Sequence, residues 1–135
     1  SAKIIPINSI LIAMYGATVG EYGIISKAMT CNQAVCALIP NIDYPYTFLF
    51  LFVKHNKQEL INMAVGSAQQ NISQLLIKQL PVLNCLGRIK EFNLIIEPNF
   101  EKIKSNQNQI RTLSQLRDNM LPKLMSGEVK VQTIK

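Results

Sequence analysis

The C-terminal part of the chain carries an apolar repeat that limits what the chain can fold into. Between Asn99 and Met125, apolar side chains return every three or four residues, the spacing of a heptad repeat in one long helix. The repeat runs along a narrow stripe, which we call the seam: Ile103, Asn106, Ile110, Leu113, Arg117, Met120 and Leu124. So narrow a stripe is typical of helices that pair with another helix, and the sequence therefore predicts a coiled coil.

Two features of the seam bear on how such a helix pairs and where it ends. Asn106 and Arg117 are polar exceptions, and polar seam residues fix register and orientation at a cost in stability. Pro122 is expected to interrupt the helix and Gly127 to end it. We expect two copies to pair antiparallel about a two-fold axis, since one surface then satisfies both copies. The alternative is that the helix folds back onto the rest of its own chain.

Residues 3–40 have a different character. They are rich in Ile, Val, Tyr and Thr, and Gly16, Gly20 and Gly23 divide them. This pattern predicts short strands within residues 9–15, 21–26 and 33–39, joined by tight turns.

Helices are predicted between this β-rich part and the seam. After Asp43, which can cap a helix, and Pro45, which fits a first turn, helical spacing continues to residue 65. It indicates one helix, or two that separate near His55. A polar loop and a short helix capped by Asn71 or Ser73 follow.

These segments predict an α+β fold. Residues 1–86 form a small β-rich domain with short helices, and residues 87–135 form a connector and the long helix. The net charge is +6, from 14 basic and 8 acidic residues without a dense basic run. This balance permits an acidic partner such as nucleic acid, although an ordinary basic surface explains it equally well.

The cysteines and the apolar runs suggest a compartment. Three cysteines without a CxxC pair favour reduced thiols over disulfides or a zinc site. The apolar run at residues 47–53 is too short to span a bilayer. We therefore expect a cytoplasmic protein that binds neither metal nor membrane.

Short matches to enzyme motifs do not hold. The stretch "DYPY" at residues 43–46 lacks a surrounding cofactor-binding unit, and "GATVG" at residues 16–20 lacks the Lys-Ser or Lys-Thr of a phosphate-binding loop. His55 is the only histidine and has no nucleophile nearby in sequence. The sequence thus predicts no catalytic residue and no cofactor.

Four separated blocks carry a family resemblance. In chain order they are "MYGATVGEYGIIS", "TCNQAVCALIP", "GSAQQNISQLLIKQLPV" and "LSQLRDNMLPKLMSGEV". Together they resemble the specificity subunit of type I restriction-modification systems. The resemblance runs from about Ser9 to Val131. It implies the later part of one target recognition domain, followed by a conserved coiled-coil helix.

The resemblance also implies a role without catalysis. Specificity subunits of this family contain two recognition domains, read double-stranded DNA, and position separate methyltransferase and restriction subunits. Two other functions stay open: the recognition domain of a single-chain methyltransferase-endonuclease, and a coiled-coil dimerisation module that binds no DNA.

DNA recognition needs basic groups for phosphates and amide or hydroxyl groups for base edges. The densest candidate loop is "GSAQQNIS" at residues 66–73. The predicted DNA-binding residues are Tyr15, Lys27, Ser67, Gln69, Gln70, Asn71, Ser73 and Lys78. Helix capping is the competing role for Asn71 and Ser73, and buried hydrogen bonding between strands is the competing role for Asn32 and Gln33.

Overall fold

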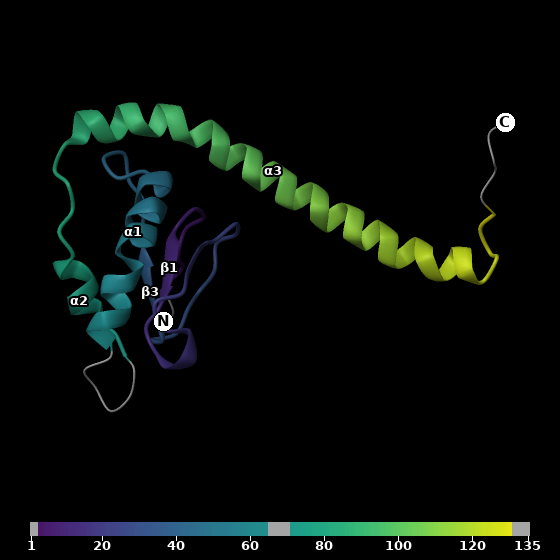
Figure 1. Ribbon diagram of the computed structural model, residues 1–135, viewed down its shortest axis with the longest axis horizontal. Coiled ribbons are helices and arrows are strands. Elements are labelled where there is room, and N and C mark those ends of the chain that lie inside the picture. The colour runs from purple at the N-terminus through teal and green to yellow at the C-terminus, as the bar shows by residue number, and fades with distance from the viewer. Residues whose placement is uncertain (1–2, 65–70, 131–135) are drawn as a thin grey trace. The chain divides into compact units, whose positions relative to one another are not determined.

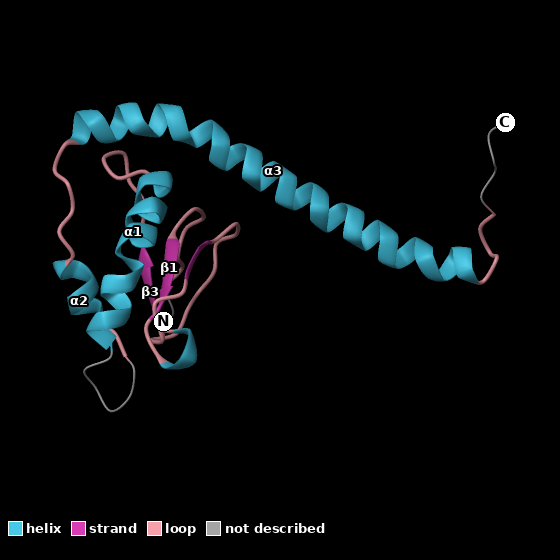
Figure 2. Ribbon diagram, in the orientation of Figure 1, coloured by secondary structure: helices cyan, strands magenta, loops and turns pink. Residues whose placement is uncertain are grey.

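The computed structural model describes residues 3–64 and 71–130 (Figure 1). Its strands are β1 (Ile10–Ala13), β2 (Tyr22–Ile24) and β3 (Val35–Leu38), and a short 3-10 helix η1 (Gly16–Thr18) follows β1. The helices are α1 (Tyr46–Ala64), α2 (Gln74–Gln79) and α3 (Leu86–Met125). Figure 2 shows the predicted α+β composition. The chain divides into two compact units, Ser1–Ile96 and Glu97–Lys135, and the boundary falls within α3.

The three strands form an antiparallel sheet in the order β2-β1-β3. Ile10 of β1 lies opposite Ile24 of β2 and Leu38 of β3, which sets the register. Ile10 and Ile12 alternate with half-buried neighbours and are themselves fully buried. The predicted strands are therefore confirmed in place, although each is shorter than its predicted segment.

Helix α1 packs on the buried face of the sheet. Val53, Leu60 and Ala64 are fully buried and join Ile10 and Ile12 in one apolar cluster. The helix is continuous, so of the two arrangements predicted the single helix is confirmed. Before it, the Asn41 carboxamide oxygen accepts the backbone N–H of Asp43 at 2.9 Å, and the turn is thus held by Asn41.

Gly20 lets the turn before β2 approach α1 closely. Its φ is +80°, a conformation that side chains disfavour. A β-carbon at this position would lie 2.8 Å from Cγ1 of Ile61. Glycine is therefore required here both by backbone conformation and by packing.

The short helix α2 begins as predicted. Ser73 is its N-cap, and the Ser73 hydroxyl accepts the backbone N–H of Leu76 at 3.3 Å. Asn71, the other predicted cap, instead pairs with Tyr15 in an isolated antiparallel bridge.

Helix α3 differs from the prediction at its start. It begins at Leu86 rather than near Asn99, and Pro98 and Pro122 both lie inside it. Its first turns pack on α1, because Ile89 is 4% exposed and the Thr47 hydroxyl donates a hydrogen bond to the Asn93 side chain. This packing stabilises a helix in the segment before Pro98, where the proline suggests a non-helical connector.

The end of α3 also needs one correction. Pro122 does not interrupt the helix, which continues to Met125. Gly127 follows at a φ of +74°, and its backbone N–H donates to the Leu124 carbonyl oxygen at 3.2 Å. The predicted glycine stop is confirmed.

Candidate nucleic-acid interface and the helix seam

Two of the predicted DNA-binding residues lie side by side, although they are far apart in the sequence. Tyr15 follows β1 and pairs with Asn71. The Ile72 N–H donates to the Met14 carbonyl oxygen at 2.8 Å and holds the two segments together. Tyr15 is 46% exposed and Asn71 is exposed, so both side chains are accessible from solvent.

A turn before β3 adds an amide side chain to the same end of the sheet. The Met14 N–H donates to the Ala34 carbonyl oxygen at 2.8 Å, which places this turn beside Tyr15. Asn32 and Gln33 are exposed, and the Asn32 side-chain oxygen accepts the Ala34 N–H at 3.1 Å. The prediction of buried hydrogen bonding for Asn32 and Gln33 is wrong, because both lie in a surface turn.

We call the exposed polar residues at this end the Tyr15 surface: Tyr15, Asn32, Asn71 and Ser73. The sequence did not single out Asn32 for this surface, because only the antiparallel register of β1 and β3 brings its turn beside Tyr15. The Ser73 hydroxyl is already engaged as the cap of α2. Helix α2 has 6 residues, so its dipole adds little to anion binding here.

The two candidate lysines lie at different places. Lys27 follows β2, whose end pairs with the start of β1, so it lies at the end of the sheet opposite the Tyr15 surface. Lys78 is exposed on α2. Burial raises the pKa of the Cys36 thiol, and the nearby positive charge of Lys78 opposes that shift.

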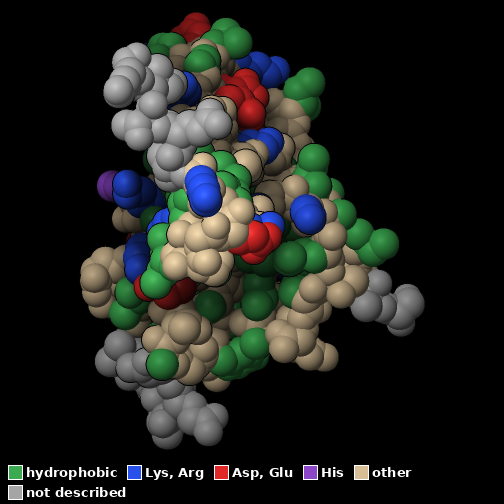
Figure 3. All heavy atoms as spheres, turned by 90° about the vertical axis from the view of Figure 1, so that its right-hand side faces the viewer, with side chains coloured by type: hydrophobic (Ala, Val, Ile, Leu, Met, Phe, Trp, Pro, Cys, Tyr) green, Lys and Arg blue, Asp and Glu red, His purple; other side chains and the backbone are tan. Residues whose placement is uncertain are grey.

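Ser67, Gln69 and Gln70 lie outside the described residues, and their role stays a prediction. On the face that Figure 3 shows, Lys and Arg side chains are interspersed with acidic and apolar ones. Within residues 3–64 and 71–130, no group of three or more His, Cys, Asp or Glu side chains could hold a metal ion. No helix in the described part of the chain is long and apolar enough to cross a membrane.

The seam on α3 is exposed. Ile110 and Leu113 are each 63% exposed, and Ile103 is 52% exposed. The Arg117 guanidinium forms an ion pair with Asp118 at 2.7 Å, and both side chains are mostly exposed. The apolar surface is also wider than predicted, because Leu116 and Leu121 flank the seam and are more than half exposed. Apolar residues at heptad positions beside a and d are the sequence signal for this widening.

Comparison with known proteins gives the family. The sequence model described as type I restriction modification DNA specificity domain matches residues 1–83. The HindI specificity subunit of a type I restriction enzyme from Haemophilus influenzae is 30% identical over 133 residues, which is 96% of this chain and 29% of that protein. The MjaIX specificity subunit from Methanocaldococcus jannaschii is 44% identical over 46 residues, 34% of this chain and 11% of that protein.

The chain thus spans less than a third of the length of either relative. The matched family region, residues 1–83, contains the whole three-stranded sheet, α1 and α2. The chain belongs to the family of type I restriction modification DNA specificity domains.

Proposed function

We propose that this chain recognises double-stranded DNA as part of the specificity subunit of a type I restriction-modification complex. The family match over residues 1–83 carries the proposal, because these residues contain the Tyr15 surface. In the complex, the bound chain would position the methyltransferase and restriction subunits on DNA. A role of this kind implies a cytoplasmic protein.

The chemistry of the Tyr15 surface suits base recognition. The side-chain amide of Asn71 can both donate and accept, as an adenine edge in the major groove requires, and Asn32 offers its N–H donors while its side-chain oxygen holds the Ala34 N–H. The Tyr15 hydroxyl adds a further donor and acceptor. Lys27 and Lys78 would contact phosphates, which sets affinity rather than sequence preference.

Gln69 and Gln70 are proposed as further base contacts, although they lie outside the described residues. Gln69 and Gln70 precede Asn71 directly in the sequence and carry the same amide groups. We therefore propose base contacts by Gln69 and Gln70 as well as by Tyr15 and Asn71.

Fluorescence anisotropy with labelled duplexes tests DNA binding. The expected result is binding to random-sequence duplexes that weakens steeply between 50 and 200 mM salt, about ten-fold or more, since phosphate contacts release counterions. Selection from a randomised duplex library then defines a preferred sequence. Binding that does not respond to salt, or no binding at 50 mM salt, contradicts the proposal.

Alanine variants separate base contacts from phosphate contacts. Asn71→Ala, and Gln69→Ala together with Gln70→Ala, should reduce discrimination between preferred and random duplexes about five-fold or more. Asn84→Ala, an exposed change of the same type, is the matched control and should leave discrimination unchanged. Lys78→Ala should instead weaken binding to all duplexes alike.

We propose that catalysis belongs to other subunits. The relatives are named as specificity subunits of type I restriction enzymes, which supports this part of the proposal. A pure sample given S-adenosylmethionine, magnesium and ATP should neither methylate nor cleave DNA. Reproducible turnover that co-purifies with the chain contradicts this part of the proposal.

We also propose that the chain self-associates through the seam. Ile103, Ile110, Leu113 and Leu124 are exposed in the single chain. Burying one such aliphatic side chain fully contributes about 1.5–3 kcal/mol, so an uncovered seam is costly. A second copy supplies the same surface and would present two identical recognition units to a bipartite DNA site.

A further inference from the structure

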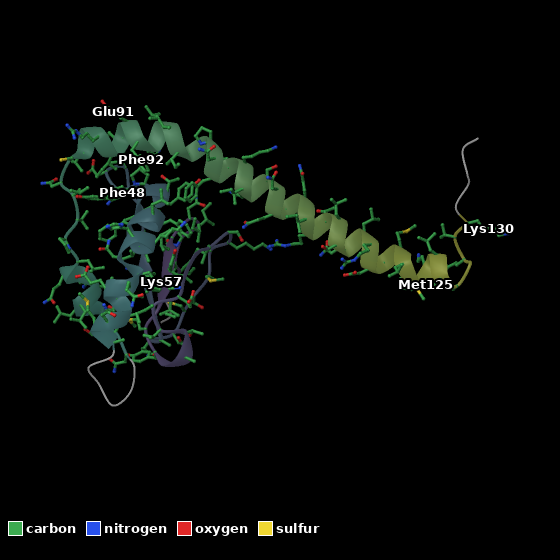
Figure 4. All side chains as sticks on the ribbon, viewed as in Figure 1. Phe48, Lys57, Glu91, Phe92, Met125 and Lys130 are labelled. Carbon is green, nitrogen blue, oxygen red and sulfur yellow. The ribbon has the colours of Figure 1, made fainter. Side chains whose placement is uncertain are left out.

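An apolar groove runs between α1 and the first turns of α3, and none of its lining residues belongs to the Tyr15 surface. Its wall on α1 is a stripe at the spacing i, i+3, i+4 and i+7: Phe48, Leu51, Phe52 and His55. The facing wall comes from α3 and the segment before it: Leu83, Cys85, Arg88, Ile89 and Phe92. Figure 4 shows Phe48 and Phe92 facing each other. Two helices thus form the sides of the groove.

The floor of the groove is held in place, whereas its rim is open to solvent. Ile89 is 4% exposed, and the hydrogen bond from the Thr47 hydroxyl to the Asn93 side chain joins α1 to α3 close by. By contrast, Phe92 is 40% exposed and Leu83 is 70% exposed. Large exposed apolar side chains around a fixed apolar floor are typical of a surface that another molecule covers.

The charge at the groove indicates the chemistry of that molecule. Arg88 brings a permanent positive charge, it is exposed, and no ion pair among the described residues involves it. None of the described lining residues is acidic. Asp43 is already paired with Lys90 at 4.0 Å, and Glu91 lies on the outer side of α3, away from Phe92 (Figure 4). The groove therefore matches an apolar face that carries a carboxylate.

An amphipathic helix fits the walls of the groove. The stripe on α1 from Phe48 to His55 extends about 10 Å at 1.5 Å per residue, which is two turns of a helix. Two turns of an incoming helix present apolar anchors at the same spacing, i, i+3, i+4 and i+7. Such a helix covers both walls at once, including the exposed faces of Leu83 and Phe92.

The long helix of a second copy has the wrong charge for this groove. Residues 97–125 hold five basic residues against three acidic ones: Lys102, Lys104, Arg111, Arg117 and Lys123 against Glu97, Glu101 and Asp118. The seam therefore lies among net positive charge, which Arg88 repels. The occupant is thus expected to be a different protein.

We propose that this groove binds an amphipathic helix of a partner protein. Apolar side chains of that helix pack on Ile89 and on the three phenylalanines of the groove, and an acidic side chain pairs with Arg88. The inference goes beyond the proposed function, because the docking surface uses none of the proposed DNA contacts.

Two synthetic peptides test the charge match. Each is an alanine-based helix of about 18 residues with leucines at i, i+3, i+4 and i+7, and carries either glutamates or lysines beside the leucines. In isothermal titration calorimetry with the full chain, we expect the glutamate peptide to bind about 3- to 10-fold tighter than the lysine peptide. Arg88→Glu should reverse this preference. Arg111→Glu, the same change outside the groove, should preserve it.

A pair of leucine variants tests the apolar contact. Leu83→Asp should weaken binding of the glutamate peptide about ten-fold, because a carboxylate replaces an apolar wall and repels the peptide. Leu94→Asp is the matched control, since Leu94 is 75% exposed and does not line the groove. Both leucines are mostly exposed, so the thermal melts of the two variants should match that of the wild type.

The reactivity of Cys85 shows whether the peptide occupies the groove itself. Cys85 lines the groove and Cys31 does not, and both thiols are exposed. Saturating glutamate peptide should slow alkylation of Cys85 by N-ethylmaleimide about ten-fold, measured by mass spectrometry, and leave Cys31 unchanged.

Four results would overturn the proposal. The first is a glutamate peptide that does not bind at about 1 mM, or binds no tighter than the lysine peptide. The second is peptide binding that leaves Cys85 as reactive as before. The third is protection of Cys85 by laurate but by neither peptide, which assigns the groove to a small amphiphile. The fourth is protection that rises with chain concentration alone, which assigns the groove to a second copy.

Discussion

Aliphatic side chains between the sheet and α1 have different surroundings from those along the seam of α3. In residues 3–64, Ile12 and Leu60 are fully buried, and α1 covers the sheet face that holds Ile12. In the second unit, Ile110 and Leu113 are each 63% exposed. The first unit thus buries an apolar core of its own, whereas the second presents an exposed apolar stripe, which we propose a second copy covers.

Apolar side chains in the groove between α1 and the first turns of α3 are intermediate in exposure between the buried core and the exposed seam. Phe48 of α1 and Phe92 of α3 line it (Figure 4), and its volume is about 430 Å³. Ile89 in the same groove is buried, although Phe92 is 40% exposed. Tertiary contact with α1 therefore accounts for helix in the segment before Pro98.

The largest expected effect on stability comes from the core of the first unit. Leu60→Ala should lower the free energy of unfolding by about 2–5 kcal/mol, since it removes a fully buried side chain and leaves a cavity. Urea unfolding followed by circular dichroism, at a concentration where the chain is monomeric, measures it. Ile110→Ala is the matched control and should change stability by less than about 0.5 kcal/mol. If Leu60→Ala and Ile110→Ala lowered the free energy of unfolding equally, the contrast between a buried core and an exposed seam would be wrong.

The close approach of Gly20 to α1 gives the next largest effect. Gly20→Ala should cost about 1–3 kcal/mol, because it strains a positive φ and meets Ile61. Gly23→Ala is the control, since no atom lies within 4 Å of the added β-carbon and its backbone is ordinary. Thermal melts that rank Gly23→Ala as the more damaging change contradict this packing.

The cap of α2 gives a smaller effect. Ser73→Ala should cost about 1 kcal/mol, because the Leu76 N–H loses its acceptor. Asn71→Ala should change stability less, since Asn71 is exposed and Ser73 is the cap. A denaturant titration of the two variants measures both losses of stability. Similar losses from Ser73→Ala and Asn71→Ala would show that Ser73 is not the sole cap.

Local patterns predicted the elements that depend on local interactions. Segments rich in Ile, Val, Tyr and Thr between glycine turns located β1, β2 and β3. The Ser73 cap, one of two candidates, and the Gly127 stop followed from short-range hydrogen bonding and backbone conformation. The start of α3 could not be found in this way, because contacts with α1 outweigh the effect of Pro98.

The candidate interface was predictable only in its parts. Tyr15 and Asn71 were each candidates, but their pairing depends on a contact between segments distant in sequence. The exposure of the turn at Asn32 could not be predicted for the same reason. The residue types in this turn also suit buried hydrogen bonding. Residue identity indicates the chemistry of such a site, whereas strand register decides which groups share a surface.

Light scattering at rising protein concentration tests most directly whether the seam of the second unit pairs with another copy of the chain. The wild-type chain should approach twice the mass of one chain at high micromolar concentration, because the seam is then buried between two copies. Ile110→Asp combined with Leu113→Asp should remain a monomer with unchanged unfolding of the first unit. A wild-type chain that stays monomeric at high micromolar concentration would contradict the account and favour packing of the helix onto its own chain.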